Sequence, residues 1–343
     1  MHGPILKTDL SQTQILEDDV LTALSRVPEE AVQLCVTSPP YNIGKSYEKG
    51  SFATFDAYRE WMTGVLEVIF LKLKPGGSLC LQVGNHVSEG RVKPLDYVFV
   101  PILEDIGFIL RNRIIWKFNF GLHAQRRLSG RYETLLWLTK GDEYKFNLDP
   151  IRVKQIYPGK RHSASKGAKA GAPSGNPQGK NPSDFWTFNP EDAFFGESVW
   201  DIPNVKANHP EKTTHPCQFP NELADRCILA FSDKGDLVLD PFVGTGTTAI
   251  CAQARGRVGL GIEIKADYVA EARKRLTLLA EGKLPIRHSG KPPAQPDGRQ
   301  KVATRPSEWD AGSSTVGSGL NGAYKEADQV EVEAEKEEGT TNS

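Results

Sequence analysis

A serine, two prolines and a tyrosine end an apolar stretch near the start of the chain. Residues 32–37 (VQLCVT) have the composition of a buried strand, and Ser38, Pro39, Pro40 and Tyr41 follow directly. Two successive prolines cannot donate to a sheet ladder, so the strand must end there. A hydroxyl, a rigid backbone and an aromatic ring are thereby presented together. A strand-ending turn without chemistry is the alternative interpretation.

A second set of residues that could do chemistry surrounds Gly244 and Gly246, in the segment LDPFVGTGTTA. These glycines lie between an expected strand and an expected helix. Glycine there allows a tight turn, and the helix N-terminus offers free N–H groups to an anion. Glu263 ends the next strand, where an acid can bind ribose hydroxyls. The spacing also fits G-x-G-x-x-A, so a nicotinamide dinucleotide is a competing ligand and a packing turn a further alternative.

Asp240 favours a different ligand for this loop. Its carboxylate would repel a pyrophosphate at the helix N-terminus, but it would suit an ammonium or a sulfonium group. S-adenosylmethionine carries both cations, with a carboxylate for the helix terminus and a ribose for Glu263. The residues predicted to bind this cofactor around the loop are Asp240, Pro241, Phe242, Gly244, Thr245, Gly246, Thr247, Thr248 and Glu263.

Short apolar strands alternate with helical patterns on both sides of these motifs. Strands are expected at residues 32–37, 76–85, 108–118, 133–139, 235–242 and 258–264. Helices are expected at residues 56–74, with Asp56 as N-cap, and at 95–106, 246–255 and 266–281. This alternation predicts an α/β fold: a Rossmann-like, mostly parallel sheet with helices on both faces.

Composition favours a folded cytoplasmic protein. The chain has 343 residues, of which 38% are hydrophobic, which is enough for a real core. It contains no apolar run long enough to span a membrane, and its first residues lack a signal-peptide pattern. The five cysteines are scattered without Cys-x-x-Cys spacing, so we expect reduced core thiols and no metal site.

Two segments interrupt the alternation. Residues 151–183 hold seven basic and no acidic residues among many Gly, Ser and Pro, which predicts a mobile basic insertion, with a solvated linker as the alternative. From about residue 284 the chain is Pro/Gly/Ser-rich and then acidic, which predicts a disordered tail. Because the acidic residues concentrate in that tail, the remainder has a net positive charge that permits nucleic-acid binding.

Taken together, TSPPY and DPFVGTGT resemble the motifs of amino-methylating DNA methyltransferases. Further matches are LKPGGSLCLQVGN, IIWKFN, RYETLLWLTKG and HPCQFPNELADRCILAFSDKGDLVLDPFVGTGTT. The catalytic motif precedes the cofactor motif, with the basic insertion between them, an order that resembles the permuted beta class. The resemblance implies a catalytic part (1–150), a target-recognition insertion (151–205), a cofactor-binding part (206–283) and a disordered acidic tail (284–343).

The resemblance also gives the residues at 38–41 roles. An exocyclic base amine is a poor nucleophile, and the Ser38 hydroxyl and Pro39 carbonyl would accept hydrogen bonds from both its hydrogens. Pro40 keeps the backbone rigid, and Tyr41 stacks on a base flipped out of the duplex. Serine at position 38 resembles the subgroup that methylates cytosine N4, with adenine N6 as the alternative. Related Asn-Pro-Pro-Tyr enzymes methylate RNA or protein glutamine, and a DNA-binding module without turnover is a further rival.

The segment HPCQFP contains a Pro-Cys-Gln sequence like that of the cytosine-C5 methyltransferases, whose thiolate attacks the ring. The segment instead resembles the cofactor motif over the methionine end of S-adenosylmethionine. We therefore expect Cys217 to be incidental, and Phe219 and Pro220 to line the cofactor.

The expected partner is double-stranded DNA. A restriction endonuclease sharing the site is left open, as is the choice between monomer and homodimer. Asp19 either faces the cofactor's adenine or caps a helix. The residues predicted to contact DNA are Arg126, Arg127, Arg152, Lys154, Lys160, Arg161, Lys166 and Lys169.

Overall fold

The computed structural model describes residues 10–41, 52–88, 90–118, 126–153, 155, 159–163, 169–186, 205 and 209–286, and the structural statements below concern these. The chain divides into two compact units, Met1–Pro293 and Ala294–Ser343, and every described residue belongs to the first. The predicted DNA contacts Lys154 and Lys166, and nearly all of the predicted tail, lie outside the described residues.

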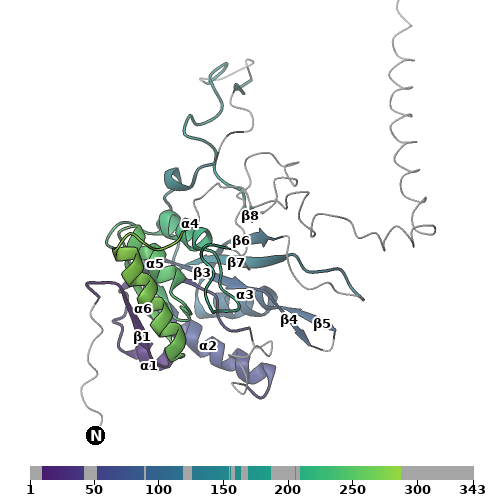
Figure 1. Ribbon diagram of the computed structural model, residues 1–343. Coiled ribbons are helices and arrows are strands. Elements are labelled where there is room, and N and C mark those ends of the chain that lie inside the picture. Colours follow the sequence, from purple (N-terminus) through teal and green to yellow (C-terminus); the bar gives the residue numbers. More distant parts are fainter. Residues whose placement is uncertain are drawn as a thin grey trace, which may run out of the picture. The chain divides into compact units, whose positions relative to one another are not determined.

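An eight-stranded sheet runs through the described part of the chain, with the spatial order β1-β10-β9-β2-β3-β7-β6-β8 (Figure 1). All neighbouring strands pair in parallel except β7, which is antiparallel to both β3 and β6. The strands are β1 (Gln14–Glu17), β2 (Val32–Thr37), β3 (Leu73–Val83), β6 (Ile109–Lys117), β7 (Tyr132–Thr139), β8 (Phe185–Trp186), β9 (Leu237–Asp240) and β10 (Val258–Glu263). The prediction of a mostly parallel sheet is confirmed.

Three helices cover each face of this sheet. Helices α1, α2 and α3 share one apolar core with the sheet, α4 and α5 share a second, and α6 packs with α5 and β1 in a third. The helices are α1 (Val20–Ser25), α2 (Phe55–Lys72), α3 (Leu95–Ile106), α4 (Asn221–Phe231), α5 (Thr247–Ala254) and α6 (Ala266–Ala280). Both faces are therefore covered, as parallel sheets require.

Strand β2 is buried on both faces, which explains why its sequence is mostly apolar. All six of its residues are buried, because Cys35 faces the core under α2 while Leu34 and Val36 face the core under α4. A strand buried on both sides gains from apolar residues on both faces, so it lacks the alternation of a surface strand.

Helix α2 repeats buried residues at the spacing of an amphipathic helix, among them Tyr58, Met62 and Ile69. Its N-cap is Thr54, whose hydroxyl accepts a hydrogen bond from the Ala57 N–H at 3.1 Å. The predicted cap, Asp56, was therefore wrong by two positions. Asp56 lies in the first helical turn, where its negative charge still favours the helix dipole.

Several elements were not predicted from the sequence. They are the short strand β8, the helix α4, and a two-stranded hairpin formed by β4 (Asn85–Ser88) and β5 (Arg91–Pro94). Of β1 and α1, the sequence indicated only a strand end or a helix cap at Asp19, as alternatives. The predicted strands and helices lie within three residues of their expected ends. No helix among the described residues is long and apolar enough to cross a membrane.

Candidate active site

The predicted motifs meet at one edge of the sheet. Strands β2 and β9 are parallel neighbours, so their carboxyl ends, Thr37 and Asp240, lie side by side. The Thr37 hydroxyl donates a hydrogen bond of 2.7 Å to Oδ1 of Asp240. The Thr248 hydroxyl, in the first turn of α5, donates one of 2.7 Å to Oδ2. Asp240 thus joins the strand that precedes Ser38 to the helix that follows the glycine loop.

Asp240 is a buried carboxylate, with 1% of its surface exposed. Burial is the largest cause of its altered ionisation and raises its pKa to about 6, because water no longer stabilises the charge. The hydrogen bonds from Thr248, Thr37 and the Phe242 N–H act in the opposite direction and limit the rise. The sequence predicted an electrostatic role in cofactor binding, whereas the structure also gives Asp240 a bridging role that the sequence did not reveal.

The glycine loop is held in a compact turn. Gly244 and Gly246 have φ angles of +52° and +92°, which side chains other than glycine rarely adopt. A Cβ on Gly246 would lie 3.0 Å from the Cβ of Ala272 in α6, so this glycine also permits close packing of the loop on that helix. The predicted residues 240–248 are therefore brought together as one turn leading into α5.

Glu263, at the end of β10, contacts this loop directly. Its Oε2 accepts a hydrogen bond from the Gly244 N–H at 3.1 Å, and its Oε1 accepts one from the Lys265 N–H at 2.8 Å. Burial raises the pKa of Glu263 above its ordinary value, since the carboxylate is largely removed from water. The acid lies where the sequence placed it, next to the loop and at the end of the adjacent strand.

The segment before α4 packs onto the same loop. The hydroxyls of Thr213 and Thr245 lie 3.0 Å apart, and Thr213 also donates to the Gln218 side chain at 2.8 Å. The His215 ring lies over Gly244, 3.4 Å from the position that a Cβ there would take. Burial and the nearby Lys212 lower the pKa of His215 to about 4, so the ring is neutral at pH 7.

Phe219 and Pro220 were predicted to line the cofactor. The structure places Phe219 in the core shared with α4, with 8% of its surface exposed, and makes Pro220 the N-cap of α4. Cys217 is exposed, and its N–H donates to the His215 ring at 3.2 Å. Thr213 and His215 contact the loop, and Gln218 holds Thr213 in place; the sequence singled out none of them for this role.

At the end of β2, Ser38 and Tyr41 form a pair. Their hydroxyls lie 3.1 Å apart, and the Tyr41 hydroxyl also donates to the Gln82 carbonyl at 3.5 Å. The Tyr58 hydroxyl donates to the Pro40 carbonyl at 2.7 Å, which ties the proline pair to α2. Pro39 is buried and the other three motif residues are half-buried, so the four predicted catalytic residues form one turn at the sheet edge.

Two side chains beside this turn were not predicted from the sequence. Gln82 donates a hydrogen bond to Glu133, and both lie at the ends of neighbouring strands, β3 and β7. A Cβ on Gly84 would lie 3.0 Å from Cε2 of Tyr41 and 3.3 Å from Oε1 of Glu133, so the ring and the carboxylate flank one glycine. Both residues lie in segments that resemble the methyltransferase family, LQVGN and RYET, and their polar side chains there are the signal that could have identified them.

Asp19 caps helix α1. Its Oδ1 accepts hydrogen bonds from the N–H groups of Leu21 and Thr22 at 3.0 and 3.1 Å. Of the two alternatives for this residue, the capping role is the one that the structure shows. Its neighbour Asp18 pairs with Arg26, and the Asp18 N–H donates to the Glu263 carbonyl at 3.1 Å.

The predicted DNA contacts differ in their surroundings. Arg126 and Arg127 are exposed in the loop between β6 and β7. Arg152 instead donates to Asp149 at 2.7 Å and to the Gly179 carbonyl at 3.1 Å, so it stabilises its own segment. Lys160, Arg161 and Lys169 are exposed, and Arg161 donates to the Gly171 carbonyl at 2.8 Å.

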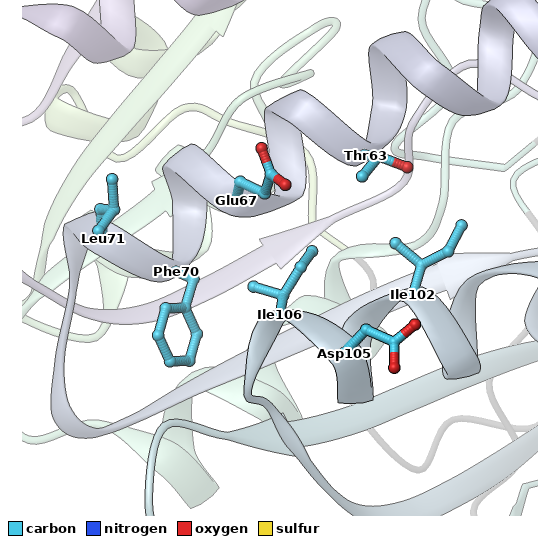
Figure 2. Close-up of a pocket in the computed structure, with 7 residues that line it drawn as sticks. All are labelled: Thr63, Glu67, Phe70, Leu71, Ile102, Asp105 and Ile106. Carbon is cyan, nitrogen blue, oxygen red and sulfur yellow. The ribbon is translucent and has the colours of Figure 1, made fainter.

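A groove of about 570 Å³ lies between α2 and α3, away from all of these residues (Figure 2). It is lined by apolar side chains such as Phe70 and Ile106, with the acids Glu67 and Asp105 at its sides. None of the predicted site residues lines it, and its negative charge does not suit DNA. Among the described residues, no group of three or more His, Cys, Asp or Glu side chains is arranged to hold a metal ion.

The class of the protein follows from this arrangement. The glycine loop follows β9, and Glu263 ends the neighbouring parallel strand β10. The Ser-Pro-Pro-Tyr turn follows β2, on the other side of β9. This is the layout of a nucleotide-type cofactor site beside a reaction site. The chain belongs to the DNA methylase family that groups N6 and N4 methyltransferases, whose model matches residues 32–274.

Curated relatives agree with this membership. The chain is 44% identical over 257 residues to the type II methyltransferase M.BglII of Bacillus subtilis, in a match that covers 75% of this chain and 66% of that protein. It is 31% identical over 267 residues to the DNA adenine methyltransferase YhdJ of Escherichia coli K12, covering 76% and 82% respectively.

Solved structures support the same fold. A protein of Thermus thermophilus, described as a DNA modification methylase and solved with S-adenosyl-L-methionine, is 28% identical with a TM-score of 0.53, over 79% of this chain and 95% of that one. The cytosine-N4-specific PvuII DNA methyltransferase has a TM-score of 0.57 at 21% identity, over 82% and 95%, and shows likeness of fold alone.

Proposed function

We propose that this DNA methylase transfers a methyl group from S-adenosylmethionine to the exocyclic N4 amine of cytosine within a specific duplex sequence. The observation that carries the proposal is the Ser38 hydroxyl, 3.1 Å from the Tyr41 hydroxyl at the carboxyl end of β2. This end of β2 is joined to the glycine loop by the Thr37–Asp240–Thr248 hydrogen bonds, so cofactor and base would be held by one rigid unit.

The residues of the glycine loop fit the cofactor. Gly244 and Gly246 have no side chains, so a ligand can approach the backbone of the loop closely. Glu263 lies at the strand end where an acid can bind ribose hydroxyls. The buried Asp240 supplies negative charge near a cationic ligand. S-adenosylmethionine supplies an activated methyl group on its sulfonium, and the chain's residues bind and orient it.

The Ser-Pro-Pro-Tyr turn would prepare the nucleophile. An amine conjugated to a ring has a delocalised lone pair, and acceptors placed for both hydrogens favour the tetrahedral nitrogen that can attack. Ser38 Oγ and the Pro39 carbonyl are these acceptors, and the contacts of Pro40 with Tyr58 and of Tyr41 with Gln82 fix their positions before the base arrives. Tyr41 would stack on the flipped base.

Adenine N6 is the second candidate for the target. The relative YhdJ, at 31% identity, is named an adenine methyltransferase, which favours adenine. Serine at position 38 favours cytosine, because the family resemblance associates an aspartate there with adenine. Both bases present an amine of the same kind to the two acceptors, so the geometry of the turn accommodates either.

The test is to identify the methylated nucleoside. The protein is incubated with unmethylated bacterial DNA and S-adenosylmethionine carrying a deuterated methyl group, and the digested DNA is analysed by mass spectrometry. Labelled N4-methyldeoxycytidine is the expected product. Labelled N6-methyldeoxyadenosine would overturn the choice of base. No labelled nucleoside, with a known methylase active in parallel, would overturn the proposed reaction for this chain.

A further inference from the structure

Leu128 is the most exposed large apolar side chain among the described residues, with 93% of its surface open to solvent. It lies in the loop between β6 and β7. A single exposed leucine is ordinary on a protein surface. The location of Leu128 and the charges beside it make it informative.

This loop emerges at the sheet edge that carries the reaction site. Strand β7 is antiparallel to both β3 and β6, so the β6–β7 connection lies at the carboxyl end of β3. The Phe118 N–H donates to the Arg131 carbonyl at 2.8 Å, which extends the hairpin by one pair. Leu128 is three residues from that pair, within about 10 Å along the chain. Glu133, which lies beside Gly84 together with Tyr41, is two residues after Arg131 in the opposite direction along the chain.

The residues around Leu128 are basic. Arg126 and Arg127 precede it and are exposed, and residues 126–131 contain no acid. The Arg127 guanidinium donates to the Leu128 carbonyl at 3.2 Å, which ties this arginine to the leucine's own backbone. Arginines beside an exposed aliphatic side chain are characteristic of elements that contact phosphates and insert a wedge between bases.

The neighbouring β4–β5 hairpin has a similar surface. Its cross-strand pair Val87 and Val92 is 40% and 44% exposed, and Arg91 beside it is exposed. The hairpin is fixed to the reaction site, since the His86 ring lies 3.4 Å from the Tyr41 carbonyl. Exposed aliphatic side chains next to arginine therefore occur both on the β6–β7 loop and on the β4–β5 hairpin. Both elements extend from the same edge of the sheet, so one long, negatively charged partner could contact both.

We propose that Leu128 inserts into the DNA base stack at the position that the target nucleotide vacates. A base that leaves the duplex breaks its stacking and pairing, and an apolar side chain entering the gap restores part of the lost contact. The arginines hold the phosphates on either side, so the leucine is directed at the stack. This inference rests on the proposed function, because it assigns a role in flipping the base that the Ser-Pro-Pro-Tyr turn receives.

The test uses two duplexes carrying the mapped methylation site, one with the target base paired normally and one with it opposite an abasic residue. The abasic partner removes pairing, so the base leaves the stack at lower cost. Single-turnover methyl transfer is measured for wild type, Leu128→Ala and Leu128→Met. We expect Leu128→Ala to be slower than wild type by tenfold or more on the paired duplex and within twofold on the abasic one. Leu128→Met, which keeps the bulk, should retain most of the wild-type rate on both.

The matched control is Leu71→Ala. Leu71 is 48% exposed near the end of α2, at the opposite edge of the sheet, and its loss should change neither rate. An equal loss on both duplexes, or no loss on the paired one, would overturn the role of Leu128. A wild-type protein that methylates neither duplex would overturn the proposed function itself. Circular dichroism and Tm of each variant separate these outcomes from misfolding.

Discussion

At the scale of single residues, Asp240 connects the two halves of the site. Both of its carboxylate oxygens are occupied by threonine hydroxyls from different elements, and it remains ionisable with a pKa of about 6. Because the pKa of Asp240 is higher in the folded protein than in the unfolded chain, a proton on this carboxyl group stabilises the folded state. That contribution to stability is complete below about pH 4 and is lost as pH rises through about 6.

Cofactor binding should show the opposite dependence. A cationic ligand favours the ionised carboxylate, so affinity for S-adenosylmethionine should rise as pH increases through about 6 and then level off. Titration calorimetry between pH 5 and 7 checks this, and Asp240→Asn should bind more weakly and flatten the profile. Because the pKa of Glu263 is also raised, Glu263→Gln serves as the comparison. A profile that keeps its slope in Asp240→Asn would contradict the assignment.

Tyr41 combines two contributions that mutation can separate. Tyr41→Phe keeps the ring but loses the hydroxyl that meets Ser38 and the Gln82 carbonyl, so methyl transfer should slow by about tenfold. Tyr41→Ala also loses stacking and should slow transfer by about a hundredfold or more. Affinity for S-adenosylmethionine should stay nearly unchanged in both. Unchanged turnover of Tyr41→Ala would remove this residue from the site.

At the scale of elements, the glycine loop depends on its contact with α6. Gly246→Ala adds a methyl group 3.0 Å from the Cβ of Ala272 and forces alanine to a φ of +92°. We expect a loss in free energy of unfolding of about 2–3 kcal/mol, with cofactor affinity reduced because the loop must shift. Chemical denaturation and calorimetry measure both quantities.

Gly282→Ala is a matched control for that prediction. Gly282 also has a positive φ, +68°, but a Cβ there would meet nothing within 4 Å. Backbone strain alone should then cost about 1 kcal/mol, with no change in cofactor affinity. If both variants lose the same stability and both bind cofactor normally, packing of the loop on α6 has no importance for the site.

The sequence predicted the strands that are buried on both faces, such as β2, and the helices whose apolar residues repeat at helical spacing, such as α3. It missed α4, which mixes buried polar residues, Asn221 and Glu222, into its first turn. It indicated α1, which has only six residues, no further than a cap at Asp19 as one of two alternatives. The four residues at 38–41 and the loop at 240–248 were identifiable from local motifs. Contacts such as Gln82 with Glu133 or Thr213 with Thr245 depend on how distant segments pack, which a single sequence does not reveal.

At the scale of the whole molecule, we expect DNA binding to depend on positive charge along one edge of the sheet. Arg126 and Arg127 lie exposed at the edge where the motifs meet, whereas Arg152 is paired with Asp149. DNA affinity should fall steeply with salt, and Arg126→Ala combined with Arg127→Ala should reduce the logarithmic salt slope by about 2, one unit for each lost phosphate contact. Arg152→Ala should change the slope less. An unchanged slope in the double variant would exclude these arginines from the DNA interface.

We expect cofactor binding and amine activation to be separate tasks of adjacent strand ends. Ser38 interacts with Tyr41, whereas Thr37 is the residue of β2 that bonds to Asp240, so we expect the two tasks to divide between these consecutive residues. The most direct measurement compares Ser38→Ala with wild type for both cofactor affinity and single-turnover methyl transfer to DNA. We predict affinity within about twofold and transfer slower by about a hundredfold or more. A Ser38→Ala enzyme that transfers methyl groups at close to the wild-type rate would contradict the account.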